Sequence, residues 1–117
     1  MAVEGIFTAI HICGDTTRIV DSLAKYDFCG FELDYKTDMV LAKKTAGARH
    51  VLFGNIDPSG VIARGTAGQV RETASKLIGV WKPGGRFILN AGCAIPASTP
   101  PENVHALVRA AREFGQY

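Results

Sequence analysis

The sequence contains little cysteine, no long hydrophobic run and no excess of charge of one sign. Three cysteines is an odd number, and without a secretory signal it does not indicate a disulfide scaffold. We therefore expect reduced thiols and a cytoplasmic location. No apolar run approaches the roughly 18 residues that a membrane span needs. The 13 basic and 11 acidic residues nearly balance, which argues against a nucleic-acid or anionic-membrane partner.

Nucleotide-binding motifs are also missing. Neither Gly-x-Gly-x-x-Gly nor Gly-x₄-Gly-Lys-Ser/Thr follows any apolar run, which disfavours a dinucleotide or P-loop site. The chain has 117 residues and is 47% hydrophobic. This length and composition predict one domain over residues 1–117 with a sizeable core.

An apolar segment followed by a helical pattern recurs four times along the chain. The pattern predicts strands within 5–13, 29–35, 49–57 and 86–95, and helices within 14–27, 38–47, 66–81 and 99–115. Asp15 or Thr16 is the expected N-cap of the first helix, and Pro58 with Gly60 predicts a loop after the third strand.

Alternating strands and helices predict an α/β fold of four βα units around a parallel sheet. The strands are nearly continuous apolar runs, typical of a sheet covered on both faces. Two arrangements fit: a small doubly wound sheet, or half of a (β/α)₈ barrel, since a whole barrel needs about 250 residues.

Polar residues gather where the predicted strands end, at the edge where parallel α/β folds carry their active sites. His11 and Cys13 lie two positions apart on the first strand and should point to the same side. Together with Cys93 and one carboxylate they would form a mixed set of nitrogen, sulfur and oxygen ligands suited to zinc. The alternative is that His11 and Cys13 are packed core residues. The remaining residues at this edge are Glu32, Asp34, Asn55, Asp57 and Asn90.

Cys29 and Trp81 are expected to be structural, and His50 and His105 to be surface or packing residues. Cys29 lies at the opposite end of its strand from this cluster, and His50 opens the next strand at that same end. His105 lies in a predicted helix, Trp81 is a packing aromatic, and Asp57 before Pro58 is typical of a turn that caps its own backbone.

Four motifs occur in the order found in the uroporphyrinogen decarboxylase superfamily. They are "HICGDTT", "GFELDYKTD", "GNIDP" and "GGRFILNAGCAIPASTPPENVHALV". The whole chain resembles the C-terminal half of that family's barrel. It is most similar to the corrinoid-linked branch, the methylcobalamin:coenzyme M methyltransferases, whose His-x-Cys…Cys zinc motif falls on His11, Cys13 and Cys93. The decarboxylases typically have a histidine at the position of Cys93, and their N-terminal arginine- and aspartate-bearing segment has no counterpart here.

This resemblance implies zinc and a corrinoid (methylcobalamin) as cofactors. A small thiol such as coenzyme M would be the methyl acceptor, and free methylcobalamin or a corrinoid protein the donor. It also implies a catalytic carboxylate after the second strand, either Asp34, which matches best by position, or Glu32. Two alternatives stay open: a decarboxylase-like enzyme acting on a tetrapyrrole, and a non-catalytic truncated half-barrel.

Half of a barrel has two free sheet edges and an inner face open to water. Pairing of two copies would cover both, so a homodimer or larger assembly is expected.

Overall fold

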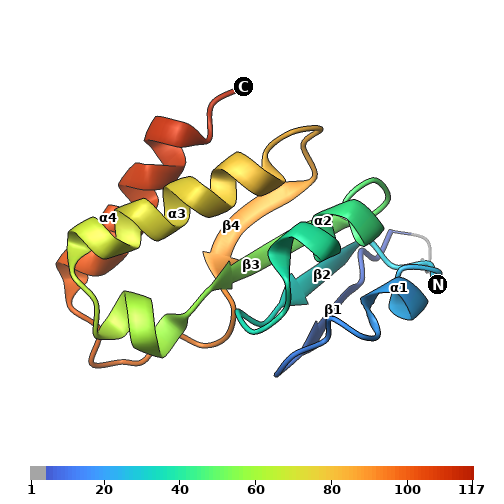
Figure 1. Cartoon of the computed structure of the whole chain (residues 1–117), viewed down its shortest axis with the longest axis horizontal. Helices are drawn as coiled ribbons and strands as arrows, with labels where there is room; N and C mark the ends of the chain where they lie inside the picture. Colours follow the sequence, from blue (N-terminus) through green and yellow to red (C-terminus); the bar gives the residue numbers. More distant parts are fainter. Residues whose placement is uncertain (1–4) are drawn as a thin grey trace.

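The computed structural model describes residues 5–117 and contains the predicted alternation of strands and helices (Figure 1). Every predicted strand and helix is present within its expected range, which confirms the α/β fold with four βα units. The elements are β1 (Ala9–Ile12), α1 (Val20–Leu23), β2 (Gly30–Leu33), α2 (Met39–Ala46), β3 (Val51–Ile56), η1 (Pro58–Ala63), α3 (Ala67–Trp81), β4 (Phe87–Ala91) and α4 (Pro101–Phe114).

The four strands form one parallel sheet in the order β1-β2-β3-β4. A doubly wound sheet reverses its strand order at a switch point, whereas a (β/α)₈ barrel adds each strand beside the previous one. The sequential order is therefore that of four consecutive barrel units, and the half-barrel alternative is the one that the structure adopts.

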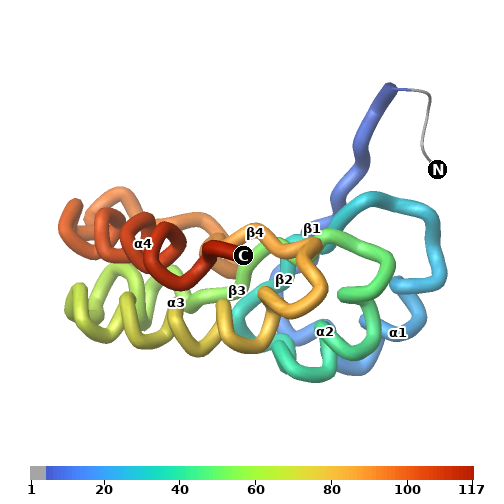
Figure 2. The backbone as a smooth tube through the Cα atoms, turned by 90° about the horizontal axis from the view of Figure 1, so that it is seen from above, coloured from blue at the N-terminus to red at the C-terminus, as the bar shows by residue number. Residues whose placement is uncertain are grey.

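The hydrophobic core lies between the sheet and its helices. Figure 2 shows α1, α2 and α3 along one side of the sheet. Trp81 at the end of α3 is fully buried, meets the Phe87 ring edge-on, and donates an indole hydrogen bond of 2.7 Å to the Met39 carbonyl. The largest fully buried apolar side chains are Trp81, Phe31, Leu33, Leu52, Ile56, Ile62, Val20 and Val70.

The opposite face of the sheet is not covered by helices within residues 5–117, so the expectation of a sheet covered on both faces is wrong for this part of the chain. A cross-strand row on this face contains His11, Glu32, Phe53 and Ile88, paired in register. Ile88 is 49% exposed. The apolar runs gave the wrong prediction because some of their residues face this open side of the sheet and not a second layer of helices.

The first helix begins later than predicted. Neither Asp15 nor Thr16 is its N-cap, since α1 starts at Val20 after Ile19. The Asp15 carboxylate accepts from the Thr17 amide, which forms a local turn instead of a helix start. The Thr16 amide and hydroxyl both lie within 3.0 Å of the Thr37 hydroxyl, and this tie to the loop after β2 holds the segment out of the helix.

The segment around Pro58 and Gly60 is a short π-helix, η1, rather than an irregular loop. The Asp57 carboxylate accepts from the Ser59 and Gly60 amides at 3.0 and 2.8 Å, which confirms the predicted turn-capping role of Asp57.

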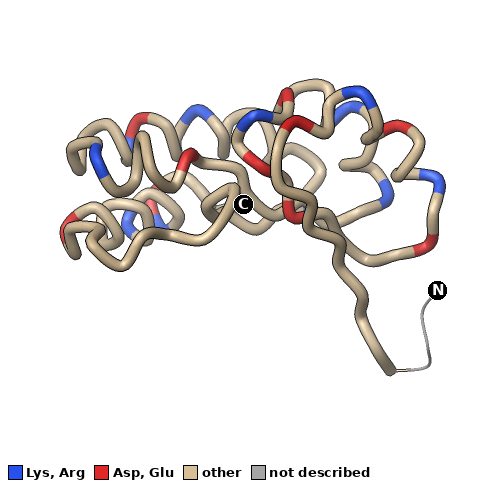
Figure 3. The backbone as a smooth tube through the Cα atoms, turned by 90° about the horizontal axis from the view of Figure 1, so that it is seen from below, with Lys and Arg blue, Asp and Glu red and all other residues tan. Residues whose placement is uncertain are grey.

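Charged residues of both signs are interspersed along the helices (Figure 3). None of the helices within residues 5–117 is long and apolar enough to cross a membrane.

Candidate metal centre

The chain after β4 crosses the carboxyl ends of its neighbours toward β1. In a flat sheet β4 would lie about 14 Å from β1, at roughly 4.8 Å per strand. Here the Gly92 amide donates to the Ile56 carbonyl at the end of β3. A Cβ at Gly92 would collide with the backbone nitrogen of Tyr35, so only glycine lets the chain pass this closely over the end of β2. This path brings Cys93 to His11 and Cys13.

The three side chains form one group. His11 Nε2 lies 3.3 Å from the Cys13 sulfur, and the Cys13 and Cys93 sulfurs are 3.9 Å apart. All three ligand atoms lie within 4.8 Å of one another. His11 and Cys13 thus share one side of β1, as strand alternation predicts. Both are exposed, which does not fit the alternative that they are packed core residues.

The imidazole of His11 is oriented by strand β2. Its Nδ1 lies 3.1 Å from the Glu32 carbonyl oxygen and 3.6 Å from the Glu32 carboxylate. A carbonyl oxygen can only accept, so Nδ1 carries the proton and Nε2 turns its lone pair toward the sulfurs. The Asn90 amide donates to the other Glu32 oxygen at 2.9 Å, which holds the carboxylate in place. Orientation of a histidine through its second nitrogen is the usual arrangement around a bound metal.

Asp34 is buried and both of its carboxylate oxygens are engaged. They accept from the Gly14 amide at 2.8 Å and from the Lys36 amide at 2.9 Å. These bonds fix the backbone next to Cys13 to the loop after β2. Neither Asp34 nor Glu32 belongs to the group of ligand atoms within 4.8 Å of one another. Which carboxylate serves as a ligand or catalytic group therefore stays a prediction.

The electrostatics of the cluster are unfavourable for two thiolates on their own. The hydrogen bond to Cys93 and the charge of Cys93, followed by desolvation and the charges of Asp34 and Glu32, raise the pKa of the Cys13 thiol above its ordinary value. A bound cation would act in the opposite direction, because positive charge favours the thiolate.

Zinc fits this donor set. Ligands at 2.0–2.3 Å from a tetrahedral zinc lie about 3.3–3.8 Å from one another. The His11–Cys13 and Cys13–Cys93 distances of 3.3 and 3.9 Å are close to that spacing. All three ligand atoms lie within 4.8 Å of one another, so the group would have to contract slightly around the ion. Three protein ligands would leave a fourth position for an exchangeable group, as in catalytic zinc sites.

The histidines outside the cluster have other surroundings. His50 is buried, stacks on Phe28 with ring centroids 4.5 Å apart, and lies 3.2 Å from the Tyr26 carbonyl oxygen, so its predicted packing role is confirmed. His105 is exposed on α4.

Asn55 lies at this edge, whereas Cys29 lies at the opposite end of the strands. Asn55 donates to the carbonyls of Asp34 and Thr37 at 3.3 and 3.2 Å, and so supports the loop beside the cluster. The amide of Cys29 donates to the Thr8 carbonyl, which places Cys29 level with Thr8, far from Cys13 along the strands. The sequence places Asn55 and Asn90 at this edge but indicates no role for them, since their partners lie 18–58 residues away.

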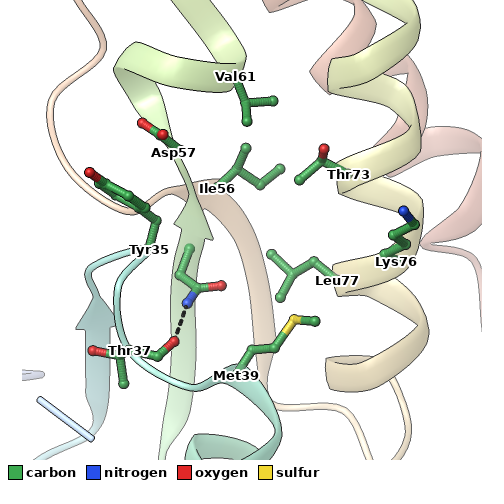
Figure 4. A pocket seen from close by; sticks show the side chains of 10 residues that line it. Tyr35, Thr37, Met39, Ile56, Asp57, Val61, Thr73, Lys76 and Leu77 are labelled. Atoms are coloured by element: carbon green, nitrogen blue, oxygen red, sulfur yellow. Dashed lines mark hydrogen bonds between the residues drawn. The ribbon is translucent and has the colours of Figure 1, made fainter. Parts of the chain in front are cut away.

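A pocket of about 300 Å³ lies between the end of β3 and helix α3 (Figure 4). Ile56, Leu77 and Met39 form its apolar part, with Tyr35 and Lys76 among its polar residues. None of the three clustered ligands lines it.

Comparison with known proteins shows a family for the chain. Residues 2–114 match the uroporphyrinogen decarboxylase (URO-D) family. The chain is 30% identical over 107 residues to the methylcobamide:CoM methyltransferase MtbA of Methanosarcina acetivorans, covering 92% of this chain and 30% of that protein. It is 36% identical over 82 residues to the uroporphyrinogen decarboxylase of Psychromonas ingrahamii, covering 70% of this chain and 23% of that protein.

A solved structure is similar as well. A methyltransferase from Methanosarcina mazei superposes with a TM-score of 0.83 at 30% identity, covering 96% of this chain and 32% of that one. The chain thus spans between about a quarter and a third of the length of the curated relatives and the solved structure that it matches. The family match extends over nearly the whole chain, and so the chain belongs to the uroporphyrinogen decarboxylase family.

Proposed function

We propose that residues 1–117 act as one zinc-binding unit of a cytoplasmic methyltransferase that moves a methyl group from a corrinoid to a small thiol such as coenzyme M. The observation that carries the proposal is the group of His11, Cys13 and Cys93. The methylcobamide:CoM methyltransferases among the relatives support the choice of donor and acceptor.

His11 Nε2 and the two cysteine sulfurs would hold the zinc. When bound, zinc supplies Lewis acidity that lowers the pKa of a substrate thiol, so that the thiol reacts as the thiolate at neutral pH. Glu32 orients His11, and Asn90 orients Glu32. Asp34 fixes the backbone at Gly14. Either carboxylate, Asp34 or Glu32, is a candidate for the catalytic role, as a ligand at the fourth position of the zinc or as a group beside it.

The proposal is tested by transfer from methylcobalamin to coenzyme M, followed by the absorbance change of the cobalamin. We expect thiol-dependent demethylation in the presence of zinc, and a fall of at least about 100-fold in the Cys93→Ala variant, because loss of even an outer partner costs 10–100-fold. The Cys29→Ser variant, altered at the far end of the strands, is the matched control and should retain the activity. Equal rates for Cys93→Ala and the unaltered chain would refute the assignment.

The uroporphyrinogen decarboxylase relatives favour a second candidate, a decarboxylase-like activity on a tetrapyrrole. Tight binding of uroporphyrinogen without any methyl transfer would support it. Zinc binding without either activity would support a non-catalytic role for this chain.

We also propose that two copies assemble and close an eight-stranded barrel. The two sheet edges, β1 and β4, have no further strand within residues 5–117, and the inner row ends in the exposed Ile88. Pairing β4 of each copy with β1 of the other, by a two-fold axis, would remove both edges and cover the inner face. Eight strands enclose an interior that side chains can fill.

Size-exclusion chromatography with light scattering at micromolar concentration should give about twice the chain mass of 12.5 kDa. An Ile88→Lys variant should be monomeric, because two lysines would be buried in the closed interior. Val108→Lys is the control: Val108 is comparably exposed, at 45% against 49%, but lies on helix α4. A stable monomer of the unaltered chain would rule out this assembly.

A further inference from the structure

The two clustered cysteines are placed to react with each other. The Cys13 and Cys93 sulfurs are 3.9 Å apart, although 80 positions separate the residues. Cys13 is exposed and Cys93 is half-buried, so small solutes have access to the pair. A disulfide needs its sulfurs at about 2.05 Å, and rotation of the side chains has to supply the difference of roughly 1.9 Å.

The third cysteine has no such neighbour. Its amide hydrogen bond places Cys29 level with Thr8, five residues before Cys13. At about 3.3 Å per strand residue the separation along the strands is roughly 16 Å. This is well beyond disulfide range in the folded chain. Oxidation should therefore be selective for Cys13 and Cys93.

We propose that Cys13 and Cys93 form a reversible intramolecular disulfide when the chain meets a peroxide. The Cys13 thiolate attacks the peroxide, its S–O bond forms as the O–O bond breaks, and one water is released. The Cys93 sulfur then displaces the oxygen from Cys13, which leaves as a second water. In total, two thiols lose two protons and two electrons, and one hydrogen peroxide is reduced to two waters. A small dithiol reductant reverses the reaction by thiol–disulfide exchange.

The disulfide would make this centre sensitive to oxidants. It removes two of the three candidate ligands, and a disulfide sulfur is no longer the thiolate that zinc binds. Oxidation would then release zinc, and reduction would restore the site. This consequence rests on the proposed function, whereas formation of the disulfide does not.

Peptide mapping tests the bond directly, because each cysteine lies in its own tryptic peptide: residues 1–18, 26–36 and 87–109. The metal-free full chain is treated with hydrogen peroxide at neutral pH, and samples are taken over several hours. Free thiols are alkylated, and the digest is analysed by mass spectrometry. We expect peptides 1–18 and 87–109 to be joined, 2 Da lighter than their sum, and 26–36 to be alkylated. Treatment with dithiothreitol should separate them.

Cys29→Ser should leave the cross-link unchanged and Cys93→Ser should abolish it. Alkylated Cys13 and Cys93 after peroxide, sulfinic acids without a link, or links only between separate chains would overturn the proposal. A parallel sample loaded with zinc, followed with a colorimetric chelator, should release about one zinc per link formed. If the unaltered chain never binds zinc, the proposed function fails while the peptide map still decides on the disulfide.

Discussion

Replacing Cys13 and Cys93 together by serine should abolish zinc binding. The unaltered chain, supplied with zinc and passed through a desalting column, should retain about one zinc per chain, and the double variant less than about 0.1. The two thiolates are two of the three ligand atoms that converge within 4.8 Å. Serine hydroxyls stay protonated at neutral pH and cannot replace them, and we expect the affinity to fall by at least about 1000-fold, well beyond the effect of an outer partner.

Elemental analysis of the purified chains is the measurement. The Cys29→Ser variant keeps all three ligands and should retain the zinc of the unaltered chain. Circular dichroism of the double variant should match that of the unaltered chain without zinc, because both cysteines lie outside the buried core. Zinc in both proteins, or in neither even after zinc is supplied, would remove the basis for a metal centre at the end of β1.

Replacing Trp81 by alanine should cost a large share of the stability of the fold. The side chain is fully buried, and its loss removes the contact with Phe87 and leaves the Met39 carbonyl without its indole donor. Large aromatic residues truncated in a core cost about 3–5 kcal/mol, and a domain has about 5–15 kcal/mol in total. We therefore expect the melting temperature to fall by more than about 10 °C.

Urea unfolding followed by circular dichroism measures this, since Trp81 is the single tryptophan and its fluorescence is lost with it. Trp81→Phe keeps a ring but loses the indole donor, so it should cost less than alanine. Tyr117→Ala, at a side chain 85% exposed, should change the free energy of unfolding by less than about 0.5 kcal/mol. A Trp81→Ala chain as stable as the Tyr117→Ala chain would show that this end of α3 contributes little to the core.

Local patterns predicted the helices well where caps and periodicity agree. Helix α3 begins after Thr66, whose hydroxyl accepts from the Gln69 amide while the Gln69 side chain accepts from the Thr66 amide. Such a capping box is a signal within four residues of sequence. The predicted start of α1 at Asp15 or Thr16 is wrong, because the Thr16 side chain bonds to Thr37, 21 positions away, instead of to its own helix.

Local sequence patterns also did not predict which face of the sheet the helices cover. An apolar residue on a strand indicates that its side of the sheet is shielded from water. It does not indicate whether a helix, another strand or a second chain provides the shield. Phe53 and Ile88 are apolar residues on the open face, where no helix within residues 5–117 covers them. Phe53 is half-buried and Ile88 is exposed. The face that the helices cover is decided by the right-handed crossover from each strand through its helix to the next parallel strand.

The sequence by itself determined the alternation of strands and helices and the shared side of His11 and Cys13, because both follow from the short periodicity of the backbone. Only the tertiary structure brought Cys93 beside them, engaged Asp34 with the Gly14 amide and linked Glu32 to both His11 and Asn90. These contacts join residues 20–80 positions apart, so they depend on strand register and on the crossing of the chain at Gly92, which no local pattern encodes.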